Sequence, residues 1–246
     1  MRPVPEEVRQ TLRPYLAEVT KLFGNALEAV VLYGSAAGGE YVSGRSNINL
    51  LLVLEKYDTD LLLRYSKLHR RWQKENIVVP LFLTTAELRD SLKVFPLEYL
   101  EMKDQHVLLA GRDPFPELHI DMTHIPSQCI QEIRGNLFRL RQRYVEGRGR
   151  PDAIALLLSL SLTAVLPCLR GLFKVSGRSY QESTEGLLEE LQPSFGIDPS
   201  VFLEVLNLKR GHISPGALEL PRLFSRYISA LETLADKVTQ GQFQHE

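Results

Sequence analysis

Two short apolar runs flank a small, glycine-rich segment near the N-terminus, and no other feature limits the fold of this chain as strongly. The first run, residues 29–33, contains β-branched side chains and ends at Gly34 and Ser35, a pattern typical of a strand that enters a turn. The second run, 49–54, is almost unbroken in its apolar character, which predicts a strand buried on both faces. The intervening residues 36–46 are small and polar, so we expect a short helix or turn followed by a loop.

Residues 1–111 alternate between helical and extended patterns around these two runs. Apolar side chains at helical spacing indicate amphipathic helices, and short apolar runs bounded by turn residues indicate strands. The predicted helices are 6–23, 58–74, a short one capped by Thr84 or Thr85 that ends near Lys93, and one that opens at Pro96. The predicted strands are 29–33, 49–54, 77–83 and 106–109. This alternation predicts an α/β (α+β) domain with a small mixed sheet.

The second half of the chain carries only helical patterns. Prolines in the run 113–116 and at Pro126 indicate a boundary, so we predict one domain over 1–115 and another over 125–246. The predicted helices run from Ser127 to Gly147, from Pro151 to about Val175, and near 180–192, 199–209 and 217–240. Their number and short connections predict a bundle of four or five helices.

The stretch from Val30 to Leu54 resembles the signature of the nucleotidyltransferase superfamily, which includes polymerase β, kanamycin nucleotidyltransferase and the small bacterial MNT antitoxins. That signature is an apolar strand, then Gly-Ser or Gly-Gly, then a spacer, and then Asp-apolar-Asp or Asp-apolar-Glu at the start of the next strand. Gly34-Ser35 and the spacer fit it, and Asn47-Ile48-Asn49 occupies the acidic position. Residues 79–88 and 95–114 are similar to the strand and tail that follow in bacterial members, so the likeness covers the predicted N-terminal domain.

Each part of this signature serves a separate chemical purpose. Gly34 lets the backbone turn tightly and approach a phosphate, and Ser35 with the amides after it can donate to phosphate oxygens. In active members of the superfamily, two carboxylates one residue apart point to the same side of the strand and hold two divalent cations. Those cations activate the attacking hydroxyl and neutralise the charge of the triphosphate. The resemblance therefore implies an ATP-like nucleotide as the ligand at Gly34 and Ser35.

Asn47 and Asn49 keep the spacing of the two acids but not their charge. An amide oxygen can bind Mg²⁺, yet Mg²⁺ sites in proteins normally contain one or two carboxylates. The third acid of the superfamily lies on the next strand, and residues 77–83 contain none. We therefore predict no metal site and impaired or absent catalysis, with Mg²⁺ as a cofactor only if activity is retained.

The asparagine pair permits two interpretations. In the first, Asn47 and Asn49 contact a bound nucleotide, and the neighbouring Arg45 binds a phosphate without a metal. In the second, both asparagines are loop residues that cap local backbone groups.

Arginines recur every seven residues along the first predicted bundle helix, at positions 134, 141 and 148. If Arg134, Arg141 and Arg148 form one edge of the helix, that edge could bind phosphates. The alternative is a solvated helix face, which is the more common role of such a pattern.

Composition excludes several classes of protein. A net charge of −1 gives no overall attraction to nucleic acid or to an anionic membrane. The two cysteines, Cys129 and Cys168, form neither a disulfide framework nor a zinc motif, and free thiols are typical of the cytoplasm. The N-terminus lacks the apolar core of a secretion signal. Residues 153–169 are uncharged but shorter than the roughly 20 residues of a membrane span, so we predict a buried bundle helix there.

Three functions are compatible with these patterns. The first is a catalytically silent nucleotidyltransferase-type protein that binds a nucleotide or a partner protein. The second is an active, metal-dependent nucleotidyltransferase that uses displaced carboxylates such as Glu40. The third is an interaction module of a toxin–antitoxin-like pair, because the predicted bundle is similar to the HEPN type that accompanies such domains; a homodimer belongs to the same class.

Overall fold

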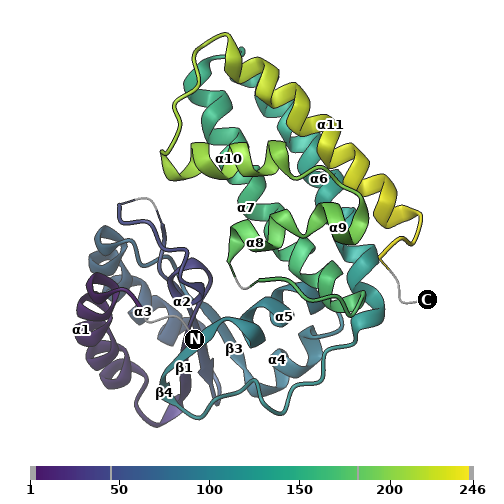
Figure 1. Ribbon diagram of the computed structural model, residues 1–246. Coiled ribbons are helices and arrows are strands. Elements are labelled where there is room, and N and C mark those ends of the chain that lie inside the picture. The colour runs from purple at the N-terminus through teal and green to yellow at the C-terminus, as the bar shows by residue number, and fades with distance from the viewer. Residues whose placement is uncertain (1–3, 45, 182, 244–246) are drawn as a thin grey trace. The chain divides into compact units, whose positions relative to one another are not determined.

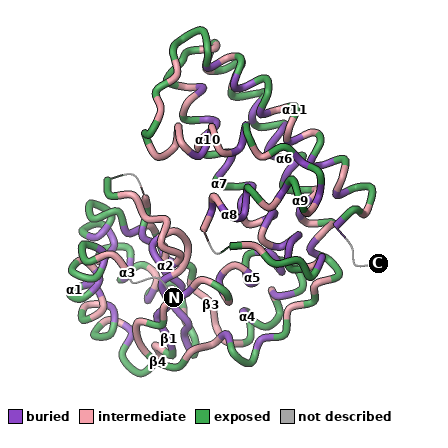
Figure 2. The backbone as a smooth tube through the Cα atoms, in the orientation of Figure 1, coloured by how far each residue is buried: buried purple, intermediate pink, exposed green. Residues whose placement is uncertain are grey.

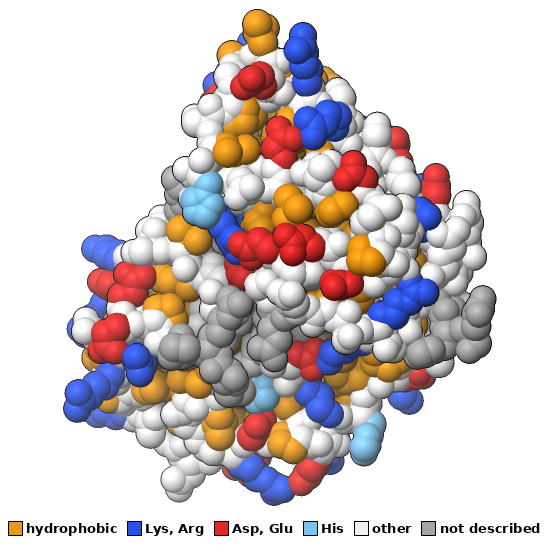
Figure 3. Space-filling view, in the orientation of Figure 1, with side chains coloured by type: hydrophobic (Ala, Val, Ile, Leu, Met, Phe, Trp, Pro, Cys, Tyr) orange, Lys and Arg blue, Asp and Glu red, His pale blue; other side chains and the backbone are white. Residues whose placement is uncertain are grey.

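The computed structural model describes residues 4–44, 46–181 and 183–243, and the chain divides into two compact units, Met1–Ile120 and Asp121–Glu246 (Figure 1). Each unit buries apolar side chains of its own, along the strands of the first and along the helices of the second (Figure 2). On the face drawn in Figure 3, acidic and basic side chains are interspersed, in keeping with the net charge of −1.

The first unit is built on a four-stranded sheet with the strand order β3-β2-β1-β4. Its strands are β1 (Leu27–Tyr33), β2 (Asn49–Leu54), β3 (Leu81–Thr84) and β4 (His106–Gly111). β1 is antiparallel to β2 and to β4, whereas β2 and β3 are parallel. The sheet is therefore small and mixed, which confirms the predicted fold class.

Helices cover both faces of this sheet. They are α1 (Glu6–Phe23), α2 (Ser35–Gly38), α3 (Thr59–Trp72), α4 (Thr85–Ser91) and α5 (Pro96–Asp104). Side chains of α1 and α3 pack with Val30 and Leu52 on one face. Side chains of α4 and α5 pack with Val31 and Val53 on the other. Successive strand residues point to opposite faces, so the unbroken apolar runs of β1 and β2 supply both cores.

The N-cap residue of α4 is Thr84 rather than Thr85. The Thr84 hydroxyl accepts from the Glu87 amide, and the Glu87 carboxylate accepts from the Thr84 amide in return, which completes a capping box. Asp58 caps α3 in the same way, through the Leu61 amide at 2.8 Å.

The third strand is shorter than the sequence predicted. We expected a strand over 77–83, but β3 begins at Leu81, and Ile77 makes only an isolated parallel bridge with Ile48. The pairing shifts by one residue between this bridge and the Leu51–Leu81 pair. Pro80 lies in the interrupted part and has no amide hydrogen to donate to a ladder, which explains the break.

The second unit consists of helices, as predicted. The described residues contain α6 (Ile125–Glu146), α7 (Pro151–Val175), α8 (Thr184–Glu189), α9 (Leu191–Phe195), α10 (Ser200–Arg210) and α11 (Glu219–Thr239). We expected four or five helices, and the described part of this unit contains six. The difference arises because the predicted helix near 180–192 is divided into the two short helices α8 and α9.

The start of α6 also differs from the prediction. The helix begins at Ile125, with Pro126 in its first turn, where a missing amide hydrogen has no cost. Ser127 is therefore inside the helix and is not its cap; its hydroxyl donates to the His124 carbonyl at 2.8 Å.

α7 is the central helix of the second unit and packs against α6, α10 and α11. Among the described residues it is the one helix long and apolar enough to cross a membrane by length and composition, and half of its most apolar window is buried in the protein. Buried polar groups join it to its neighbours. The Ser161 hydroxyl lies 2.6 Å from the Asn136 side-chain oxygen and 3.1 Å from the Tyr227 hydroxyl.

Candidate functional site

The turn at Gly34 has a backbone shape that only glycine adopts without strain. β1 ends at Tyr33, and Gly34 then takes φ 72° and ψ −154° before α2 begins. The Gly34 carbonyl accepts the amides of Ala37 and Gly38 at 3.0 and 2.9 Å. A Cβ atom on Gly34 would lie 2.9 Å from the side-chain nitrogen of Asn49, so the missing side chain also makes room for Asn49.

Asn49 opens β2 directly beside this turn, because it pairs with Tyr33 in the antiparallel ladder. Ile48 is 1% exposed, and the residues on either side of it point the other way. Asn49 is half-buried and Asn47 is exposed. Within the described residues, neither side-chain amide makes a hydrogen bond. The structure thus brings Gly34 and Asn49 into contact and leaves the amides of Asn47 and Asn49 open to a ligand.

Two other residues of the sequence prediction belong to the same loop. Arg45 lies outside the described residues. Glu40 follows α2, and its backbone amide donates to the Ser35 carbonyl at 2.9 Å. Ser35 is the first residue of α2 and is half-buried.

Two residues beside the turn were not among the predicted site residues. Tyr33 is flanked by Asn49 on β2 and by His106 on β4, so three neighbouring strands place these side chains in one row. Burial, and then the nearby Glu101 carboxylate, raise the pKa of the Tyr33 hydroxyl, which therefore stays protonated. The sequence could not identify this row because its members come from three segments that meet only through strand pairing.

His106 is held rigidly in this row. Its Nδ1 lies 2.9 Å from the Met102 carbonyl, and its Nε2 lies 3.1 Å from the Asp113 carboxylate. The ring is 8% exposed and packs against Phe115 at a centroid distance of 4.6 Å. Both ring nitrogens are thus engaged by the protein, and His106 acts as a support for the strand end.

Gln105, the residue between α5 and β4, makes a second close approach at the turn. A Cβ atom on Gly38 would lie 2.3 Å from the Gln105 side-chain oxygen, so Gln105 covers the end of α2. The turn is therefore enclosed by Asn49 on one side and by Gln105 on the other.

The side chains of the predicted nucleotide-binding residues Ser35, Asn47 and Asn49 are neutral. Ser35, Asn47 and Asn49 offer one hydroxyl and two amide oxygens, which do not match the carboxylates that Mg²⁺ prefers. Across residues 4–44, 46–181 and 183–243, no three His, Cys, Asp or Glu side chains gather in a way that could hold a metal ion. The chemistry that these donors support is hydrogen bonding to a polar or anionic ligand.

The predicted arginine edge is engaged within the second unit. Arg134 lies 3.0 Å from Asp236, and Arg141 pairs with Glu232 at 2.5 Å, both on α11. Arg148 is exposed and lies beyond the end of α6, with φ 53°. Arg134 and Arg141 thus pair α6 with α11. Arg148 lies outside the helix, so the three arginines do not form one helix edge.

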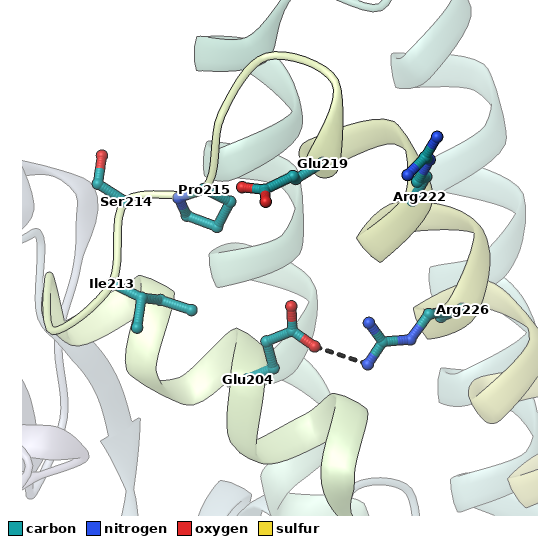
Figure 4. A pocket seen from close by; sticks show the side chains of 7 residues that line it. All are labelled: Glu204, Ile213, Ser214, Pro215, Glu219, Arg222 and Arg226. Carbon is teal, nitrogen blue, oxygen red and sulfur yellow. Dashed lines mark hydrogen bonds and ion pairs between the residues drawn. The ribbon is translucent and has the colours of Figure 1, made fainter.

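The second unit has an open cavity of about 400 Å³ at the start of α11 (Figure 4). The Arg226 guanidinium points to Glu204 and lies 2.6 Å from its carboxylate. The Glu219 carboxylate accepts the Gly216 amide at 2.7 Å. One ion pair, Arg226 with Glu204, thus lies inside this cavity, and Glu219 is engaged by a backbone amide.

Comparison with known proteins bears on the fold of the chain. No family model and no curated protein matches the chain. A solved structure does: the spectinomycin adenyltransferase AAD(9) from Enterococcus faecialis, determined with ATP and spectinomycin, aligns with a TM-score of 0.52 at 11% identity. The alignment covers 91% of this chain and 99% of that one.

The chain has a nucleotidyltransferase-like fold. At this identity the similarity concerns the fold and not the activity. It extends over both units, so the helical half belongs to the shared architecture as well.

Proposed function

We propose that the first unit binds a nucleotide through its phosphates at the Gly34-Ser35 turn and that it transfers nucleotidyl groups poorly or not at all. The observation that carries this proposal is the contact of Asn49 with Gly34. An amide therefore stands beside the turn, at the place where the superfamily signature has a metal-binding acid.

Several features of the turn favour a phosphate. Ser35 supplies a hydroxyl, and the side-chain amides of Asn47 and Asn49 can donate to phosphate oxygens. Their neutrality also avoids the repulsion that carboxylates exert on a phosphate when no metal is present. The solved neighbour binds ATP, which agrees with a nucleotide as the ligand. We include Arg45 as a further phosphate contact on sequence grounds.

The same neutrality argues against efficient transfer. Loss of one preorganised group that stabilises charge in a transition state lowers rates by about 10²–10³. Loss of both cation ligands removes two such contributions, along with the activation of the attacking hydroxyl. Binding by the wild type should accordingly depend little on Mg²⁺.

Calorimetry with ATP, with and without Mg²⁺, tests this proposal. We expect the wild type to bind ATP in both conditions and Asn47→Asp/Asn49→Asp to bind only with Mg²⁺. Asn25→Asp/Asn207→Asp adds the same charge elsewhere and should behave as the wild type does.

A pyrophosphate-release assay in the same conditions addresses the displaced-acid alternative. Turnover by the wild type with Mg²⁺ or Mn²⁺, abolished by Glu40→Ala, would contradict the proposal and support an active enzyme. Absence of ATP binding by the wild type at millimolar ATP would contradict the proposal that the turn binds a nucleotide.

A partner protein or a second copy of the chain is the other candidate ligand, and one observation on the second unit favours it. Leu156 and Leu160 lie one turn apart on α7 and are 59% and 49% exposed. An exposed apolar face of this kind is typical of interaction sites. Light scattering after size exclusion tests for a homodimer, which Leu156→Glu/Leu160→Glu should dissociate; a wild-type monomer would rule the homodimer out.

A further inference from the structure

A second hollow lies in the first unit, far from the Gly34 turn. Its volume is about 470 Å³, and α4 and the segment 112–118 form its sides. Its floor is Ala29, Val53, Leu88 and Leu118, which are 1–3% exposed. Ala29 lies on β1 and Gly34 directly follows that strand, five residues along, which at the rise of a strand is about 17 Å. A ligand here would occupy a different site from a nucleotide at the turn.

Two arginines on the rim share one carboxylate. Arg112 lies 2.6 Å from Glu117, and Arg89 lies 3.9 Å from the other oxygen of the same side chain. All three side chains are more than half exposed, at 84%, 62% and 63% for Arg112, Arg89 and Glu117. Solvent screens such an exposed group of charges, so Glu117 is weakly held and can be displaced.

The backbone beside Arg112 is fixed, which gives the rim a defined position. The Arg112 amide donates to the Glu28 carbonyl at 3.1 Å. Gly111 has φ 82°, and a Cβ atom there would lie 1.9 Å from the same carbonyl oxygen. β4 therefore approaches β1 as closely as only glycine permits, and Arg112 leaves the sheet at the mouth of the hollow.

The other charged residues of the rim are acidic. Glu28 accepts a hydrogen bond from the Thr85 hydroxyl at 2.6 Å, and Asp113 is bonded to His106 and to the Phe115 amide. With Glu117, the rim carries three acids and two arginines. Because the acids on this rim outnumber the arginines by one, a singly charged anion is repelled less than a doubly charged phosphate.

We propose that this hollow binds a small monocarboxylate with an aromatic or branched aliphatic body. The body lies on the apolar floor, and the carboxylate takes the place of Glu117 between Arg89 and Arg112. Arginine suits this role because its planar guanidinium donates two parallel hydrogen bonds to a carboxylate.

Methyl NMR of the full chain with indole-3-acetate as the probe tests this proposal. We expect the methyl signals of Leu88 and Leu118 to shift on titration, and the neutral indole-3-acetamide to bind about tenfold more weakly, because it lacks the charge-assisted bonds. Glu117→Gln should tighten indole-3-acetate binding several-fold, because it removes the competing charge. Arg89→Gln/Arg112→Gln should weaken binding by about tenfold or more.

Arg9→Gln is the matched control, because Arg9 is also exposed and pairs with Glu6 at 3.1 Å on α1. It should leave binding unchanged. The proposal is overturned if the Leu88 and Leu118 methyls do not shift at about 10 mM probe, far above the Kd of a specific small ligand. It is equally overturned if the amide binds as well as the acid, or if Glu117→Gln weakens binding. Circular dichroism confirms that each exposed-site variant is folded.

Discussion

At the scale of single residues, the candidate site is defined by two glycines without side chains and by an asparagine without a charge. Gly34 lacks the side chain that would collide with Asn49, and Gly38 lacks the one that would collide with Gln105. Asn49 lacks the charge that a metal ion would need. The two glycines therefore let Asn49 and Gln105 pack closely against the turn, and the neutral side chain of Asn49 is a poor match for a metal ion.

We expect Gly34→Ala to abolish ATP binding and to lower the free energy of unfolding by about 1–3 kcal/mol, because φ 72° strains a side-chain-bearing residue and the new Cβ meets Asn49. Urea unfolding and calorimetry measure the two effects. Gly24→Ala is the control: Gly24 has φ 54° and open space around it, at the other end of β1. It should lose some stability and retain ATP binding. A Gly34→Ala protein that binds ATP normally would exclude the turn as the site.

At the scale of elements, α1 and α3 are joined by a buried pair of tyrosines. The hydroxyls of Tyr15 and Tyr65 lie 2.9 Å apart, and both rings are at most 2% exposed. Burial raises the pKa of both hydroxyls, to about 12 for Tyr65 and further for Tyr15. The two helices are thus joined by a hydrogen bond between buried hydroxyls, and it is burial that keeps these hydroxyls protonated.

This pair makes stability sensitive to alkaline pH. The unfolded chain ionises its tyrosines near pH 10, whereas the folded chain resists ionisation, so the contribution is complete below pH 10 and is lost as the pH rises through about 12. We expect the free energy of unfolding to fall across this window in the wild type. The free energy of unfolding of the Tyr15→Phe/Tyr65→Phe variant should fall less steeply with rising pH. At pH 8 this variant should lose little stability, since both hydrogen-bond partners are removed together. Urea unfolding at several pH values measures this; equal slopes would contradict it.

At the scale of the whole molecule, the chain consists of two compact units, and each has its own buried core. The core of the first lies on the two faces of the sheet. That of the second surrounds α7, with buried residues from α6, α10 and α11. Units with separate cores are expected to fold separately.

We predict that residues 121–246 fold on their own. This fragment should show a helical circular dichroism spectrum and a cooperative thermal transition, because it retains every helix that packs on α7. A fragment that begins at Leu137 is the control. It removes Cys129 and Ile133, both fully buried, and should not fold cooperatively. A non-cooperative 121–246 fragment would show that the second unit depends on the first.

The sequence by itself determined the element types, the mixed sheet and the helical second half. Those features follow from local periodicity, caps and turn residues, which act over a few positions of the chain. It did not determine the late start of β3 at Leu81, where Pro80 interrupts the ladder, or the division near 180–192 into two helices.

Only the tertiary structure decided which residues meet. Asn49, Tyr33 and His106 share a row through strand pairing, and Arg134 and Arg141 are bound to acids on α11 about a hundred residues away. The hollow beside Arg112 likewise forms from segments that are distant in the chain. Such contacts depend on how strands pair and how helices pack, and local sequence patterns specify neither.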